Sequence, residues 1–88
     1  MREITRIDKD VEIILMNNVN GTIILEDGSQ KTILYNYGDY EYFTYDQVRR
    51  MVSRNRKLFS NLHVVIIGSV DKEYTAQQVA CSLGLRRE

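Results

Sequence analysis

Few side chains in this 88-residue sequence have the types and spacing that catalysis requires. A hydrolytic triad needs a nucleophile, a base and an orienting acid, and the one histidine, His63, borders the apolar run 64–67. Such a histidine is expected to be structural. Asp39 and Glu41 would share one face of a strand, where two carboxylates could hold a cation or exchange protons. Solvated charges on an edge strand are the simpler interpretation.

The glycines and the single cysteine exclude several other chemistries. All five glycines stand singly, so the sequence contains no glycine-rich phosphate-binding loop. Cys81 cannot form an internal disulfide or a multi-cysteine zinc site, and its lone presence indicates a reducing, cytosolic setting. We expect it to act as a small hydrophobe beside the buried stripe of the last helix. The sequence therefore predicts no enzyme, with no catalytic residue, no cofactor and no metal.

Tyrosine is concentrated in one short segment. Five of the six tyrosines fall in 35–45, together with Phe43. Tyrosine supplies a large contact area at low entropic cost, which suits a protein interface. The alternative is that the rings pack on the small core, with Tyr35, Tyr42 and Tyr45 covering it and Tyr37 and Tyr40 at its edge. Five tyrosines so close together favour the interface.

A cluster of cations follows the tyrosines. Segment 49–57 contains five of them, namely Arg49, Arg50, Arg54, Arg56 and Lys57. Cations beside aromatic rings can bind single-stranded nucleic acid, but Asp39, Glu41 and Asp46 lie among the same rings, and the whole chain has zero net charge. A solvated helix face explains the cations equally well.

The predicted partner is another protein subunit, through self-association or phage assembly, with nucleic acid as the alternative and no membrane. The predicted partner-binding residues are Tyr37, Tyr40, Tyr42, Arg49, Arg50 and Arg54.

The first half of the chain reads as strands. We expect a lead-in strand or arm over 1–10, a strand over 11–16, and a hairpin of 22–26 with 31–35 around Asp27 and Gly28. A bulged turn with a left-handed Gly28 would pair Ile23 with Ile33 and Leu25 with Lys31, and would align Tyr35 with the apolar face.

The second half mixes strands and helices. Segment 40–44 is predicted as a short strand with Phe43 facing the core and Tyr40 and Tyr42 facing outward. Thr44 with Gln47, and Thr75 with Gln78, form capping boxes for helices over 45–57 and from 75 to Gly84. Segment 63–68 is predicted as a central strand buried on both faces. The stripes of the two helices are Val48, Met51, Val52 and Asn55, and Ala76, Val79, Ala80 and Leu83.

This order of elements predicts one α+β domain over 1–88, a small and mostly antiparallel β-sheet with two helices packed on it. Segment 38–44, followed by Val48, Met51, Asn55, Lys57 and Phe59, resembles small proteins of tailed bacteriophages over 17–85. The resemblance implies a phage-encoded protein without known catalysis, located in the host cytoplasm or the virion. The function predicted is a non-enzymatic phage accessory or virion structural protein that docks on other proteins. The alternative is a small regulator that binds single-stranded nucleic acid.

Overall fold

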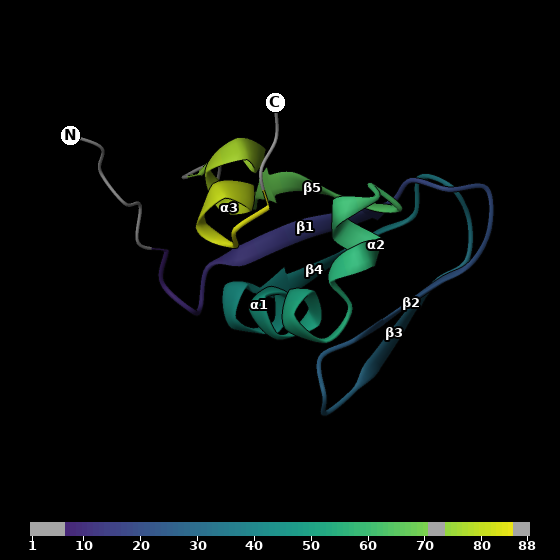
Figure 1. The fold of residues 1–88 in the computed structure, drawn as a ribbon, viewed down its shortest axis with the longest axis horizontal. Coiled ribbons are helices and arrows are strands. Elements are labelled where there is room, and N and C mark those ends of the chain that lie inside the picture. The colour runs from purple at the N-terminus through teal and green to yellow at the C-terminus, as the bar shows by residue number, and fades with distance from the viewer. Residues whose placement is uncertain (1–6, 71–73, 86–88) are drawn as a thin grey trace.

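A computed structural model describes residues 7–70 and 74–85 (Figure 1). Its elements confirm the α+β prediction. They are β1 (Glu12–Asn17), β2 (Ile23–Glu26), β3 (Lys31–Leu34), β4 (Tyr40–Thr44), α1 (Tyr45–Arg54), α2 (Arg56–Ser60), β5 (Val64–Ser69) and α3 (Ala76–Ser82). Of the predicted lead-in segment, 1–6 lie outside the described residues, and 8–10 form a turn closed by a 3.1 Å hydrogen bond from Val11 N to Asp8 O.

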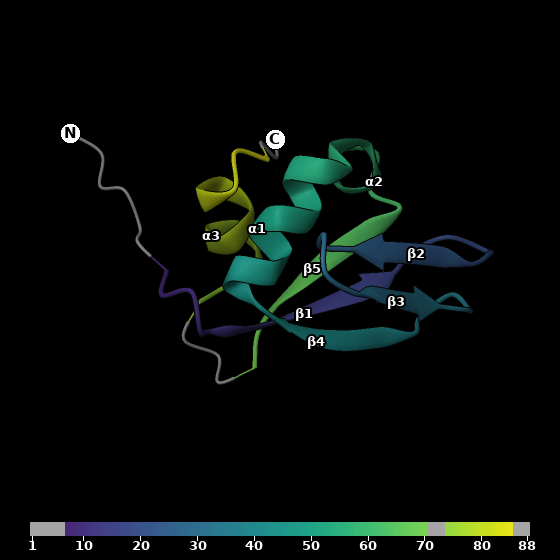
Figure 2. The ribbon, with the colours of Figure 1, turned by 90° about the horizontal axis from the view of Figure 1, so that it is seen from below.

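The strands form two antiparallel sheets where the sequence predicted one. A three-stranded sheet has the order β4-β1-β5, and β2 and β3 pair only with each other in the described part of the chain. The three helices lie on one side of the three-stranded sheet (Figure 2). The core between the helices, the hairpin and the sheet contains Ile13, Leu15, Leu25, Leu34, Phe43, Val48, Met51, Phe59 and Val79 among others.

The hairpin register differs from the predicted one. Ile23 pairs with Leu34 and Leu25 pairs with Thr32, so four residues form the loop. The reason is the Asp27 side chain, whose Oδ1 accepts hydrogen bonds from the backbone N–H groups of Ser29 and Gln30 at 2.8 and 3.0 Å. The predicted positive φ of Gly28 is confirmed at 104°. Because of the shift, Leu34 enters the core in place of Ile33, and Tyr35 is exposed.

The first helix begins as predicted and ends early. Thr44 and Gln47 form the capping box, and Val48, Met51 and Val52 are buried. Asn55 was expected on this buried stripe, but it is exposed and interrupts the helix with φ −146° and ψ 68°. The break redirects the chain into α2, whose Phe59 is buried in the core.

Strand β5 was predicted as a central strand buried on both faces, and this is wrong. β5 is an edge strand and β1 is central. Because the helices cover one face of the sheet, Val64 and Ile66 are buried while Ile67 is 48% exposed. His63, expected to be a structural side chain at the start of this strand, is exposed, and its backbone N–H donates to Leu58 O at 2.9 Å.

The last helix also follows its predicted signals. The capping box of Thr75 and Gln78 is present, and Val79 and Ala80 are buried. Gly84 has a φ of 78°, and Leu85 N donates to Ala80 O at 2.9 Å, which closes the helix and buries the Leu85 side chain. Cys81 is exposed, contrary to the expectation that it packs near the buried stripe. None of the helices in the described ranges is long and apolar enough to cross a membrane.

Candidate protein-docking surface

The three-stranded sheet has two faces of different character. Side chains alternate between the faces of a strand, and Ile13 and Leu15 of β1 and Phe43 of β4 point to the helices and are buried. The intervening side chains therefore point to the opposite side. We call six of them the outer sheet face: Ile14 and Met16 of β1, Tyr40 and Tyr42 of β4, and Val65 and Ile67 of β5. Glu12 and Thr44, which lie opposite each other at one end of these strands, point to the same side and border this face.

The strand register brings the members of the outer sheet face together. Tyr42 lies opposite Ile14, and Tyr40 lies opposite Met16, which in turn lies opposite Val65. The rings of Tyr40 and Tyr42 have centroids 6.1 Å apart and planes inclined by 32°. That separation is within the range of favourable aromatic pairs. Six side chains from three strands thus form one contiguous surface.

The six side chains of this surface carry no charge and are at least partly exposed, and the exposed carboxylate of Glu12 borders them. Tyr40 is 57% exposed and Tyr42 is 48% exposed, whereas Phe43, which follows Tyr42 in β4, is only 4% exposed. The predicted directions of Tyr40, Tyr42 and Phe43 are therefore confirmed. Two phenol hydroxyls are the polar groups among the six side chains. A face of aromatic and aliphatic side chains with charge only at its border has the composition of an interface centre.

The turn that precedes β4 is held by Asn17 at the end of β1. Asn17 N donates to Asp39 O at 2.8 Å, and Gly38 N donates to Asn17 O at 2.9 Å. The Asp39 carboxylate accepts a 2.9 Å hydrogen bond from Asn36 N, so this side chain closes the turn. Tyr37 lies in this turn and is exposed. The turn therefore fixes where β4, with its two tyrosines, begins.

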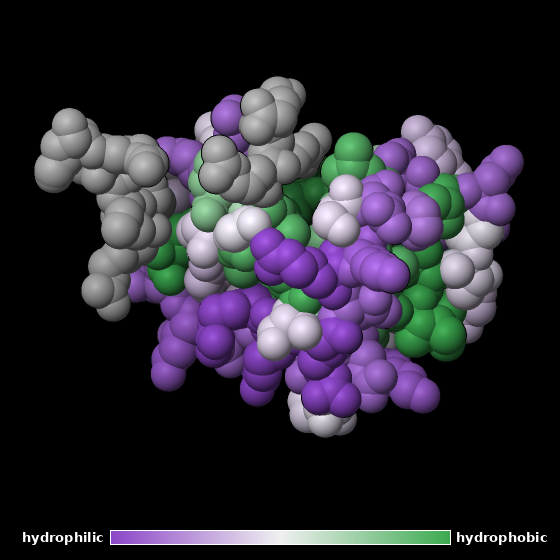
Figure 3. Space-filling model, in the orientation of Figure 1, coloured by the Kyte–Doolittle hydropathy of each residue, from purple (hydrophilic) through white to green (hydrophobic). Residues whose placement is uncertain are grey.

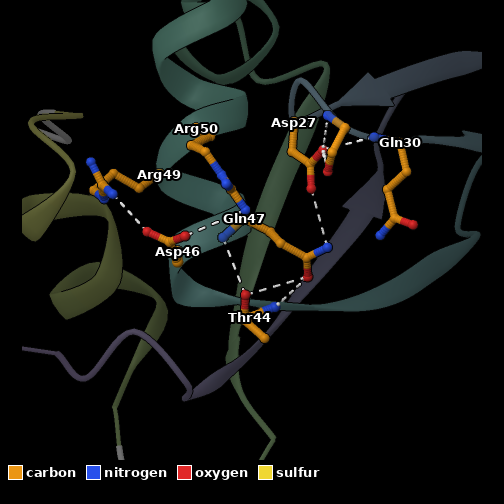
Figure 4. Close-up of polar contacts among 8 residues, drawn as sticks. Asp27, Gln30, Thr44, Asp46, Gln47, Arg49 and Arg50 are labelled. Atoms are coloured by element: carbon orange, nitrogen blue, oxygen red, sulfur yellow. Dashed lines mark hydrogen bonds and ion pairs between the residues drawn. The ribbon is translucent and has the colours of Figure 1, made fainter.

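A second polar link joins the end of β4 to the hairpin. Gln47 Oε1 accepts a hydrogen bond from Thr44 N at 2.9 Å, and Gln47 Nε2 donates to Asp27 Oδ2 at 3.2 Å (Figure 4). The capping side chain of α1 therefore also holds the β2–β3 loop. Backbone N–H groups of Ser29 and Gln30 keep the pKa of the buried Asp27 carboxyl well below its usual range, against the opposing effect of burial.

The predicted arginines do not share the surface of the tyrosines. Arg49 Nη2 lies 2.6 Å from Asp46 Oδ1 and Arg50 Nη2 lies 3.3 Å from Asp46 Oδ2, all on α1 (Figure 4). The hydrogen bond from Arg49 and the charge of Arg50 lower the pKa of Asp46. α1 packs on the helix-covered side of the sheet, opposite the outer sheet face (Figure 2). Arg54 extends over the hairpin turn at Gly28.

The sequence reasoning missed four members of the outer sheet face: Ile14, Met16, Val65 and Ile67. The signal was present in β1, where the positions alternating with the core residues Ile13 and Leu15 are also aliphatic or methionine. An amphipathic strand with one solvated face would place polar residues there. The continuous apolar run in β5 carries the same signal, and was interpreted as burial on both faces.

The described residues contain no group of three or more side chains arranged to hold a metal ion. Comparison with protein families, with curated proteins and with solved structures finds no match to this chain. The site is thus defined by its own geometry, that of an apolar sheet face centred on two tyrosines.

Proposed function

We propose that this protein is non-enzymatic and docks on other protein subunits through the outer sheet face. The observation that carries the proposal is that no helix or strand in the described ranges covers this face, although it presents Tyr40, Tyr42 and Ile67 about half exposed. Water contact with so many clustered apolar side chains is unfavourable, and a partner surface would remove it. Tyrosines at the centre of such a patch are typical binding hot spots.

The resemblance of segment 38–59 to small proteins of tailed bacteriophages supports a more specific form of this proposal. The protein would then be a phage accessory or virion structural protein, acting in the host cytoplasm or the assembled particle. Its partners would be further copies of itself or other phage subunits. A flat sheet face suits this role, because two sheets pack face to face through interdigitating side chains.

The test compares tyrosines of equal exposure at different places. Tyr40→Ala and Tyr42→Ala should each weaken docking by about five- to thirtyfold, the range expected of moderate hot spots. Docking is measured either as self-association, by sedimentation velocity, or as incorporation into particles. Tyr35→Ala removes an equally exposed ring outside the outer sheet face and should leave both unchanged. Equal effects at all three positions would contradict the proposed surface.

Unfolding measurements separate docking from folding. Tyr40→Ala and Tyr42→Ala should change the free energy of unfolding by no more than about 1 kcal/mol, the span of strand propensities. Phe43→Ala should lower it by about 3–5 kcal/mol, because this ring is buried in the core. If the tyrosine variants unfold, the patch is part of the core. Submicromolar binding of single-stranded oligonucleotides that weakens steeply with salt would favour the nucleic-acid alternative.

A further inference from the structure

A groove of about 600 Å³ lies between the β2–β3 hairpin and helices α1 and α2. Leu25, Met51 and Phe59 contribute apolar side chains that also belong to the core, and Ile24 and Leu58 line the groove closer to the surface. Hydrophobic side chains gather over the hairpin and are bordered by hydrophilic ones (Figure 3). The volume falls within the range of about 300–1,000 Å³ that is usual for ligand sites.

The groove runs along the unpaired edge of β2. Ile24, Leu25 and Glu26 all line it, although alternate side chains of a strand point to opposite faces. A groove that touches three consecutive residues must lie beside the edge of the strand. β3 is the one strand that pairs with β2 in the described ranges, so the edge toward the groove has no strand partner.

The hydrogen-bond alternation shows which backbone groups face the groove. Asp27 N donates to Gln30 O at 3.3 Å, which makes this a hydrogen-bonded pair at the end of the ladder. In an antiparallel ladder such pairs alternate with pairs that do not bond each other. Leu25 with Thr32 is then a bonded pair, and Ile24 and Glu26 are not bonded to β3. The N–H and C=O groups of Ile24 and Glu26 therefore point into the groove.

A strand added at this edge would place its side chains in defined positions. Directly opposite residues on neighbouring strands share one face of a sheet. A residue opposite Leu25 would therefore point with Leu25 toward the core side, where Met51 and Phe59 line the groove. An apolar side chain suits this position. The backbone would gain hydrogen bonds to Ile24 and Glu26, the interaction by which extended peptides bind to sheet edges.

The charges beside the groove favour an acidic ligand. Glu26 lies directly opposite Lys31 in the hairpin, so these two charges offset each other. Arg49 and Arg50 are paired with Asp46, whereas no carboxylate of the described residues lies within ion-pair distance of Arg54, which lines the groove. The net charge at the groove is positive. A carboxylate on the ligand would complement Arg54.

We propose that this groove binds an extended segment of another protein that adds as a strand to the free edge of β2, with an apolar side chain inserted beside Met51 and Phe59 and a carboxylate at Arg54. The site is separate from the outer sheet face and does not depend on docking there. It gives the molecule a second and more selective binding surface, because strand pairing, an apolar insertion and one charge must be satisfied together.

The test uses a pair of terminally blocked seven-residue peptides, each with a central leucine flanked by valine and threonine. One carries glutamate at both ends and the other carries lysine. Titration of the isotope-labelled protein by NMR should shift the backbone amides of Ile24 and Glu26, with the glutamate peptide binding about threefold more tightly, as expected for a partly exposed ion pair. An N-methylated version of the glutamate peptide cannot pair with a strand and should not bind.

Charge-reversal variants test whether Arg54 is the cation that sets the preference between the two peptides. Arg54→Glu should reverse the preference in favour of the lysine peptide, and Arg49→Glu, on the exposed face of the same helix, should leave it unchanged. The proposal fails if neither peptide shifts these amides at millimolar concentration, if the N-methylated peptide binds equally, or if the preference survives Arg54→Glu. Shifts confined to Tyr40 and Tyr42 would also overturn it while leaving the docking function in place.

Discussion

Replacing Asn17 with alanine should strongly destabilise the protein. The Asn17 side chain is fully buried at the end of β1 and joins two separate segments. Its Nδ2 donates to Gly21 O at 2.7 Å and to Leu34 O at 3.0 Å, and its Oδ1 accepts from Val19 N at 2.8 Å. These bonds attach the β2–β3 hairpin to the three-stranded sheet.

The expected magnitude follows from the three hydrogen bonds. Each contributes about 1 kcal/mol to stability, so Asn17→Ala should cost about 3 kcal/mol. A domain of this size has a total stability of about 4–13 kcal/mol. The midpoint of thermal unfolding should therefore fall by about 12–24 °C.

Asn18 provides a matched control for this experiment. Its side chain makes one exposed hydrogen bond, from Nδ2 to Leu62 O at 3.0 Å, so Asn18→Ala should cost less than about 1 kcal/mol. Urea unfolding measures both costs, and amide hydrogen exchange should show that Asn17→Ala accelerates exchange in β2 and β3 more than in β1. Equal costs for the two variants, or unchanged exchange in the hairpin, would refute the role assigned to Asn17.

Two further predictions concern the caps and the hairpin loop. Thr44→Ala and Thr75→Ala should each lower the free energy of unfolding by about 1 kcal/mol, because each removes the acceptor of a capping box, and unchanged urea midpoints would contradict this. The pKa of the Asp27 carboxyl is lowered on folding from its ordinary value of 3.8, so its contribution to stability is present above that pH and is lost as the pH falls below it. Urea midpoints measured at decreasing pH should fall less in Asp27→Asn than in the native chain, because only the contribution of other carboxyls such as Asp46 remains. Asp10→Asn, at an exposed position, should keep the native pH dependence.

Local patterns in the sequence were sufficient for most of the secondary structure. The capping boxes at Thr44 and Thr75 located both helix starts, because a cap depends on side chains only three residues apart. Strand alternation likewise predicted that Tyr40 and Tyr42 would point away from Phe43. These features involve neighbours in the chain, so no knowledge of the tertiary contacts was needed.

Contacts between residues distant in the sequence determined the features that local patterns did not predict, namely the hairpin register and the exposed face of β5. The hairpin register depends on the Asp27 carboxylate, which bonds its own loop and also Gln47, twenty residues further along the chain. The exposure of Ile67 follows from the edge position of β5 and from the helices covering one face of the sheet. The sequence shows 64–67 only as apolar, and apolar composition is the same for a strand buried on both faces and for one whose outer face is exposed. Packing alone distinguishes the two, because a side chain is buried only when another element lies against it.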